Sequence, residues 1–256
     1  MKKIVLAVIA FLLSVNTLFA ECSAWYTTFF PSEKKLASNG LIIFQGYQGA
    51  VMIVRDLNKK YPIYLQSGKH KVRLEVIELN EGYATLQAIL KPSEALKVEL
   101  EYELIVENYQ PTSKDYMISK YDYSTQKHEK PTWKIEKAIP NNLEWIKKPV
   151  VTKKSYEEFG CGPAIHVDFD FEVKSQNTYF IKAIIIDSQN KAKSTYWLEI
   201  GTQKSKLDIG HGMCSGNFNF QRGDNYEITF DMIDNSGKIF AWKEKPVQFS
   251  RPTLQR

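Results

Sequence analysis

Histidine and cysteine are scarce in this chain: its 256 residues include four histidines and three cysteines. No histidine stands in the H-E-x-x-H spacing that places two zinc ligands on one face of a helix. No nucleophile, general base and orienting residue come together in a known motif either. We therefore predict no catalytic residue, no bound cofactor and no enzyme activity.

Long apolar runs and charge of one sign are also missing beyond residue 20. A membrane-spanning helix needs about 20 consecutive apolar residues, and no such run follows the first twenty. The 34 basic residues only slightly outnumber the 29 acidic ones, and the lysines are dispersed, whereas nucleic-acid binding usually shows as a clustered basic face. We expect no nucleic-acid partner and no transmembrane segment in the mature chain.

The first twenty residues have the order of a secretion signal. Lys2 and Lys3 precede an apolar stretch, and small residues lead up to Ala20, as in a cleavable signal peptide. The apolar stretch is too short for a membrane anchor. A lipid on Cys22 is the other alternative, but Glu21 stands where lipoprotein signals carry a small residue. We predict cleavage after Ala20 and a periplasmic or secreted protein.

Alternation of apolar and polar residues dominates the rest of the chain and predicts strands with one buried face. No amphipathic helix longer than one or two turns is evident. The clearest alternating stretches are Val98 to Glu107, Ala164 to Val173 and Tyr226 to Met232. Shorter apolar runs, such as Val51 to Arg55, are also predicted as strands. The expected fold is therefore all-β, with two immunoglobulin-like antiparallel sandwiches.

The strand pattern is weakest between Pro111 and Pro149, which marks a domain boundary. We predict a signal at 1–20, a first sandwich at 21–110, a connection at 111–147, a second sandwich at 148–252 and a tail at 253–256. The connection is too aromatic for a plain flexible linker. Its aromatic residues could pack between the domains or form a binding surface, for which the candidates are Tyr116, Tyr121, Tyr123 and Trp133.

Three cysteines in a secreted protein allow one disulfide and leave one residue over. Cys161 and Cys214 each lie beside a predicted strand of the second sandwich. We therefore predict that these two residues pair and that Cys22 is left over or pairs elsewhere.

The segment from Asp208 to Gly216 allows three interpretations. Its G-x-C-x-G sequence matches a nucleophile elbow, but an alternating segment follows where an elbow needs a helix. His211, Met213 and Cys214 have the side chains of a copper site. If Cys214 is oxidised, only His211 and Met213 remain as candidate ligands. The favoured interpretation is a tight glycine bend that brings Cys214 to Cys161.

Two rows of charged residues are candidates for hard cations. His166, Asp168, Asp170 and Glu172 alternate along one predicted strand, and glutamates alternate from Glu99 to Glu107. Residues two apart lie on one face of a strand, so adjacent carboxylates could flank calcium. The solvated outer face of a sheet is the favoured interpretation of both rows.

Two parts of the chain resemble known extracellular modules. The first hundred residues resemble bacterial immunoglobulin-like domains, and the second half is similar to immunoglobulin-like or fibronectin type III modules. The residues concerned are Phe30-Pro31-Ser32, Leu36 to Ile42, Leu90-Lys91-Pro92 and Leu96 to Tyr102 in the first half, and Cys161-Gly162-Pro163 and Trp242 to Pro252 in the second. The resemblance implies sandwich folds outside the cytoplasm and transfers no catalytic residue.

These observations favour a non-catalytic binding or structural module of the bacterial cell envelope. Its expected partner is a protein or another envelope component, and the expected state is a monomer. Two alternatives stay open. One is a periplasmic copper-binding protein that uses His211 and Met213, and the other is a hydrolase whose site forms at the junction of the domains.

Overall fold

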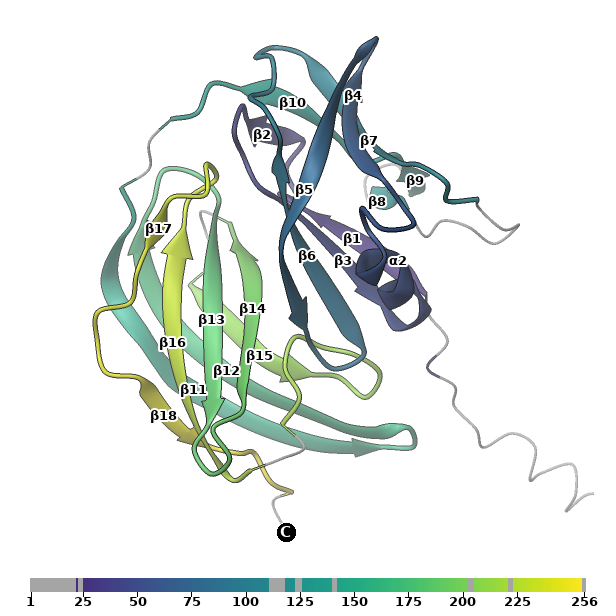
Figure 1. Cartoon of the computed structure of the whole chain (residues 1–256). Helices are drawn as coiled ribbons and strands as arrows, with labels where there is room; N and C mark the ends of the chain where they lie inside the picture. The colour runs from purple at the N-terminus through teal and green to yellow at the C-terminus, as the bar shows by residue number, and fades with distance from the viewer. Residues whose placement is uncertain are drawn as a thin grey trace, which may run out of the picture.

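The computed structural model describes residues 22, 25–110, 118–122, 126–139, 142–201, 205–220 and 223–254, with no side chains for 120–122. The fold is all-β, and nearly all strand pairs are antiparallel. It has two units with separate hydrophobic cores, drawn in purple to teal and in teal to yellow in Figure 1. The expected signal at 1–20 lies outside the described residues.

The first unit is one continuous eight-stranded sheet in the order β1-β3-β6-β5-β4-β7-β10-β2. Its strands are β1 (Tyr26–Phe30), β2 (Lys35–Ala37), β3 (Ile42–Tyr47), β4 (Ile63–Ser67), β5 (His70–Glu81), β6 (Thr85–Pro92), β7 (Glu101–Val106) and β10 (Thr132–Glu136). A bulge between Val76 and Glu78 interrupts the pairing of β5 with β6. β5 pairs with β4 through its first residues and with β6 through the rest, so the sheet folds around one core.

A short helical segment covers one end of this core. It consists of η1 (Gln48–Ala50) and α2 (Val51–Arg55). The prediction of a strand at Val51 to Arg55 is therefore wrong. Ala50, Ile53, Val54 and Leu57 are buried, which is the i, i+3, i+4, i+7 spacing of a helix face.

The second unit is a sandwich of two sheets. One has the order β11-β12-β15, and the other has the order β14-β13-β16, with β17 and β18 both paired to β16. Side chains of both sheets meet in one core, as in aligned sandwiches. The strands are β11 (Glu144–Phe159), β12 (Gly162–Lys174), β13 (Tyr179–Asp187), β14 (Lys193–Ile200), β15 (Lys206–His211), β16 (Asn225–Ile233), β17 (Ile239–Phe240) and β18 (Val247–Ser250).

Two of the three clearest alternating stretches form strands as predicted. In the third, from Val98 to Glu107, β7 covers only Glu101–Val106, and Val98 and Leu100 are exposed. Ile165, Val167, Phe169 and Phe171 are all buried on β12, and Tyr226 to Met232 forms most of β16. β5 with β6 and β16 with β17 form two antiparallel hairpins. Two immunoglobulin domains are not confirmed, because the first unit is a single sheet that folds over itself.

The connection expected at 111–147 is shared between the two units in its described parts. β10 pairs with both β7 and β2 of the first unit, whereas β11 starts the second unit at Glu144. A two-stranded ribbon, β8 (Lys120–Asp122) with β9 (Lys127–Glu129), lies between β7 and β10 in sequence. The first unit therefore continues to about residue 136, beyond the expected end at 110.

The two units pack through a third apolar cluster. Leu41, Ile43 and Ile89 of the first unit meet Phe180, Trp197 and Ile233 of the second. Gln87, with no exposed surface, accepts a 2.9 Å hydrogen bond from Trp197 N and donates a 2.8 Å bond to Trp197 O. Its amide thus takes the place of a neighbouring strand at the edge of β14.

Candidate binding sites at the junction of the two units

The glycine-rich bend after β15 docks on the first unit. Gly212 N donates to Ser215 O at 3.0 Å, which closes the bend. Tyr83 and Gly216 then exchange two backbone hydrogen bonds of 2.9 Å each. A Cβ atom at Gly82 would collide with Gly216 O, so only glycine at position 82 permits this approach. The predicted bend is present, but it faces the other unit.

The disulfide joins Cys22 to Cys214, with the two Cα atoms 5.4 Å apart. The predicted bond between Cys161 and Cys214 is therefore wrong. Cys161 lies in the turn between β11 and β12 and is not part of the disulfide. The bend carries Cys214 to the first unit, where Gln48 donates a hydrogen bond to the carbonyl oxygen of Cys214. Its sulfur partner there is Cys22, shortly before β1.

The copper alternative keeps only His211 and Met213 as candidate ligands. The thiolate of Cys214 is lost to the disulfide, and the ring of His211 packs against Tyr83 with 4.3 Å between centroids. Among the described residues, no three His, Cys, Asp or Glu side chains are grouped closely enough to hold a metal. His211 is 1% exposed, its Nδ1 bonds Gly212 O at 2.9 Å, and its Nε2 is buried without a hydrogen-bond partner. It is a packed residue of the junction.

The burial of His211 predicts that the protein loses stability in mild acid. Burial lowers the pKa of His211 below its ordinary value, although the Gly212 carbonyl acts in the opposite direction. The unfolded chain then binds a proton more readily than the folded protein. The stabilisation is therefore complete above the ordinary pKa of about 6.5 and is lost as the pH falls below it.

Urea unfolding at about pH 7.5 and about pH 5 checks this expectation. The His211→Gln variant should lose less stability on acidification than the wild type. His166 acts oppositely, because its 2.9 Å bond to Asp208 raises its pKa. Its stabilisation is present in acid and is lost as the pH rises through the raised value. His166→Gln should therefore steepen the acid loss, and equal slopes for wild type and His211→Gln would contradict the assignment.

Lysines on neighbouring strands face the charged rows proposed as cation sites. Register places Lys147 opposite Glu172, Lys153 opposite Asp168, and Lys206 opposite Asp170. Along β7, Glu103 bonds Lys130 at 2.6 Å, and Glu99 just before the strand bonds Lys134 at 2.8 Å. This arrangement fits the favoured interpretation of solvated sheet faces.

The predicted aromatic surface of the connection is not formed by Trp133. Trp133 is 1% exposed in the first core, and its Nε1 donates to Pro31 O at 3.0 Å. Tyr116 and Tyr123 lie outside the described residues. Tyr121 is on β8 opposite His128, and its side chain is not described.

Two exposed aromatic residues, Trp25 and Tyr26, lie where β1 begins, and the half-buried Tyr47 of β3 packs against Tyr26. We call Trp25, Tyr26 and Tyr47 the N-terminal aromatic surface. Trp25 is 59% exposed and lies over Gly49, where a Cβ atom would collide with its ring. Tyr26 stacks on Tyr47 with 4.1 Å between centroids. Burial raises the pKa of Tyr47 to about 12, which keeps its phenol neutral. The sequence alone did not predict this surface, although Trp25 is only three residues after Cys22.

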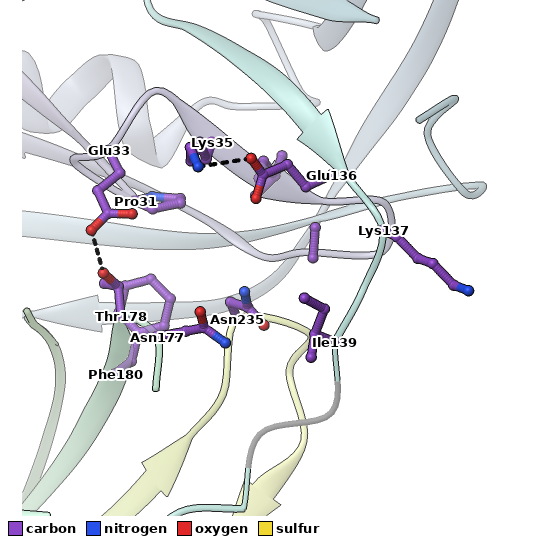
Figure 2. A pocket seen from close by; sticks show the side chains of 12 residues that line it. Pro31, Glu33, Lys35, Glu136, Lys137, Ile139, Asn177, Thr178, Phe180 and Asn235 are labelled. Atoms are coloured by element: carbon purple, nitrogen blue, oxygen red, sulfur yellow. Dashed lines mark hydrogen bonds and ion pairs between the residues drawn. The ribbon is translucent and has the colours of Figure 1, made fainter. Parts of the chain in front are cut away.

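A small pocket lies between the units near β2, as Figure 2 shows. Three of its charged side chains, Glu33, Lys35 and Glu136, already have partners. Glu33 accepts a 2.7 Å hydrogen bond from Thr178, and Lys35 forms a 2.9 Å ion pair with Glu136. Its volume is about 110 Å³, whereas ligand pockets usually hold about 300 to 1,000 Å³. We therefore do not assign a ligand to it.

A larger hollow, the junction cavity, lies between the β5–β6 turn, the β13–β14 hairpin and residues 218–220. Its volume is about 410 Å³. Glu81 of the first unit and Asp187 of the second both line it. A pair of carboxylates at the junction is what the hydrolase alternative would need. Their contacts do not favour hydrolysis. Glu81 pairs with Arg55 at 3.1 Å, and Asp187 Oδ1 accepts Gln189 N at 2.8 Å within the hairpin turn.

No family model matches this chain. No curated protein matches it either. Among solved structures, the type I pullulanase of Bacillus subtilis str. 168 complexed with maltose is 11% identical, with 89% of this chain and 25% of the pullulanase covered and a TM-score of 0.25. The chicken CNTN1 FN1–FN3 domains are 9% identical, with 89% and 98% covered and a TM-score of 0.24. The chain thus spans a quarter of the pullulanase, and neither likeness is close enough to support a function.

Proposed function

We propose that the protein is a non-catalytic binding module that works outside the cytoplasm, in the periplasm or as a secreted protein. The observation that carries this proposal is the N-terminal aromatic surface. Aromatic side chains are enriched at the centres of interfaces because they bury a large area at a low entropic cost. The proposed partner is a protein or another component of the cell envelope, bound by the monomer.

The Cys22–Cys214 bond supports the proposed compartment. Disulfides persist in oxidising compartments and are rare in the cytosol. Within the described part of the chain, no helix is both long and apolar enough to cross a membrane. A cleaved signal ending at Ala20 remains our prediction.

We also propose that the second unit is related to fibronectin type III modules. Numbered along the chain, its first, second and fifth strands form one sheet, and its fourth, third and sixth form the core of the other. In constant-type immunoglobulin domains the fourth strand belongs to the first sheet. Its place in the second sheet supports a fibronectin-like arrangement.

The rigid junction supports a role as a scaffold. The apolar cluster, Gln87, the Tyr83–Gly216 pair and the disulfide all connect the two units. The Lys182–Glu78 ion pair adds a 2.9 Å contact that is mostly buried on both sides. Apolar packing, hydrogen bonds, an ion pair and a disulfide between the units favour a fixed position for the N-terminal aromatic surface. Trp25 of this surface is three residues after Cys22 of the disulfide.

Site-specific photocrosslinking tests the proposed surface. A photoreactive phenylalanine analogue at position 25 should give a discrete covalent adduct in native envelopes. The same analogue at Ile239, which is similarly exposed on the second unit, should not. The Trp25→Ala/Tyr26→Ala double variant should abolish partner binding with less than about 0.5 kcal/mol change in stability, as for exposed side chains in general.

The controls separate binding from folding. Ile239→Ala removes a comparable exposed apolar side chain and should bind the partner normally. Equal crosslinking from positions 25 and 239, or normal binding by the double variant, would remove the support for the proposed surface.

A further inference from the structure

The outer edge of β11 is protected along its first half only. β11 is the outermost strand of its sheet, and none of the described strands pairs with its outer side. Such an edge accepts a further strand unless bulges, proline or repulsive charge prevent it. Three register shifts fall between Trp145 and Lys153, and Pro149 lies among them. From Lys153 to Phe159 the pairing with β12 is regular, so this second half keeps the geometry that a further strand needs.

The regular half carries a charge pattern that is complementary to itself. Lys153 and Lys154 come first. Two uncharged residues follow, and then Glu157 and Glu158. All four charged side chains are exposed. Lysines alone would repel a second copy of the strand, but in an antiparallel pair the basic end of each copy lies against the acidic end of the other.

The two faces of the strand fix the register of such a pair. Tyr156 is paired with the fully buried Ile165 of β12 and packs against the core. Residues two positions apart share a face, so Lys154 and Glu158 lie on the same face as Tyr156. Residues directly opposite each other in a sheet also share a face. A two-fold pair centred on Tyr156 therefore sets Lys154 of each copy opposite Glu158 of the other.

Existing contacts leave these charges available. Lys154 Nζ donates to Ser250 Oγ at 2.8 Å, and Glu158 Oε2 accepts from the Tyr156 hydroxyl at 2.6 Å. An ammonium group has more than one donor, and a carboxylate has several acceptor positions. β18, which carries Ser250, pairs with β16 along the other sheet. The edge of β11 is thus contacted by a side chain and is not covered by a strand in the described part of the chain.

We infer that a second copy of this chain occupies this edge, so that two molecules pair antiparallel through Lys153 to Phe159 of β11. Lys153 and Glu157 then become diagonal neighbours across the pair, on the face opposite Tyr156. The contact is isologous, because each copy supplies the same strand. One short strand pair is a small interface, so we expect a weak, salt-dependent association.

This pairing uses no residue of the N-terminal aromatic surface. The single chain stays the unit that binds the envelope partner, and the β11 pair joins two such units. The inference therefore stands or fails independently of the function proposed above.

Analytical ultracentrifugation over a range of protein concentrations tests the pairing. Cys161→Ser is the background for all variants, because it removes the thiol outside the disulfide that could link two copies covalently. In about 20 mM salt this protein should pass from monomer towards dimer between about 5 and 500 µM, and about 500 mM salt should shift it back towards monomer. A monomer at every concentration in low salt would overturn the inference.

Charge reversal distinguishes this pair from non-specific association. The Lys153→Glu/Lys154→Glu variant makes the segment acidic throughout. The Glu157→Lys/Glu158→Lys variant makes it basic throughout. Each variant alone should stay monomeric where the background protein dimerises, because like charges then face each other, and an equimolar mixture of the two should dimerise again. Dimers of either variant alone, or no dimer in the mixture, would contradict the charge pairing. The substituted positions are exposed, so both melting temperatures should stay close to that of the background protein.

Photocrosslinking identifies what occupies the edge. A photoreactive phenylalanine analogue at Phe159, which is 43% exposed, should give an adduct with the mass of two chains. The same analogue at Ile146, which is 60% exposed in the bulged half of the strand, should not. Equal yields of the two-chain adduct from both positions would contradict the inference. An adduct of another mass from position 159 in native envelopes, without the two-chain adduct, would assign the edge to a different protein and overturn it.

Discussion

Replacing Cys22 with serine is expected to lower the free energy of unfolding by about 5 kcal/mol in the chain-entropy account of disulfides. The bond closes a loop between residues 192 positions apart, so its loss frees most of the chain in the unfolded state. Urea unfolding of the oxidised wild type and the variant measures the difference. Cys214→Ser should lose a similar amount.

Cys161→Ser is the control for this series. Cys161 is outside the disulfide, so the variant should keep the Cys22–Cys214 crosslink in a non-reducing peptide map. A large loss of stability in Cys161→Ser, or a mapped crosslink that contains Cys161, would show that the predominant pairing in solution differs from the one described.

Replacing Trp133 with alanine should lower stability by about 3 to 5 kcal/mol, as expected for a large aromatic residue removed from a core. Trp133 is fully enclosed in the first unit and bonds Pro31 through its indole nitrogen. The loss combines a cavity with a buried carbonyl that no longer has its donor. Equilibrium unfolding in urea measures the effect.

Two matched variants give this prediction its contrast. Trp133→Phe keeps most of the volume and should retain more stability than Trp133→Ala. Trp25→Ala removes the same kind of side chain from an exposed position and should change stability by less than about 0.5 kcal/mol. Similar losses at positions 25 and 133 would contradict the assigned burial.

Burial could not be assigned to the aromatic residues of the connection from sequence alone. Trp133 stands in a short extended segment rich in lysine and proline, which gives no clear buried face. Its burial follows from the pairing of β10 with β7 and with β2, and β2 comes nearly a hundred residues earlier. Conversely, the exposure of Trp25 is not evident from its neighbours.

The helix at Val51 to Arg55 shows a different limit. The run is apolar from Val51 to Val54, and such short runs fit a strand or a buried helix equally well. The decisive pattern extends beyond it, from Ala50 to Leu57, and a longer window would have found the helical spacing.

Parts of the candidate sites did leave a trace in the sequence. Gln87 is the one polar residue in the run from Leu86 to Leu90, which signals a buried amide with a specific partner. Asp187 ends the apolar run of β13 and precedes Ser188-Gln189-Asn190, a turn sequence. Neither position indicates that the two units meet there.

The sequence by itself determined the class of the fold and the positions of most strands, because a strand's buried face is written in the alternation of adjacent residues. The tertiary structure alone decided that Cys214 bonds Cys22, that Trp133 belongs to the first core and that Asp187 lines a cavity between the units. The first and third outcomes depend on how two separately patterned units dock, and the second depends on the pairing of β10 with β2 and β7 within the first unit. Docking is set by shape and amide contacts between residues far apart in the chain, which local periodicity does not encode.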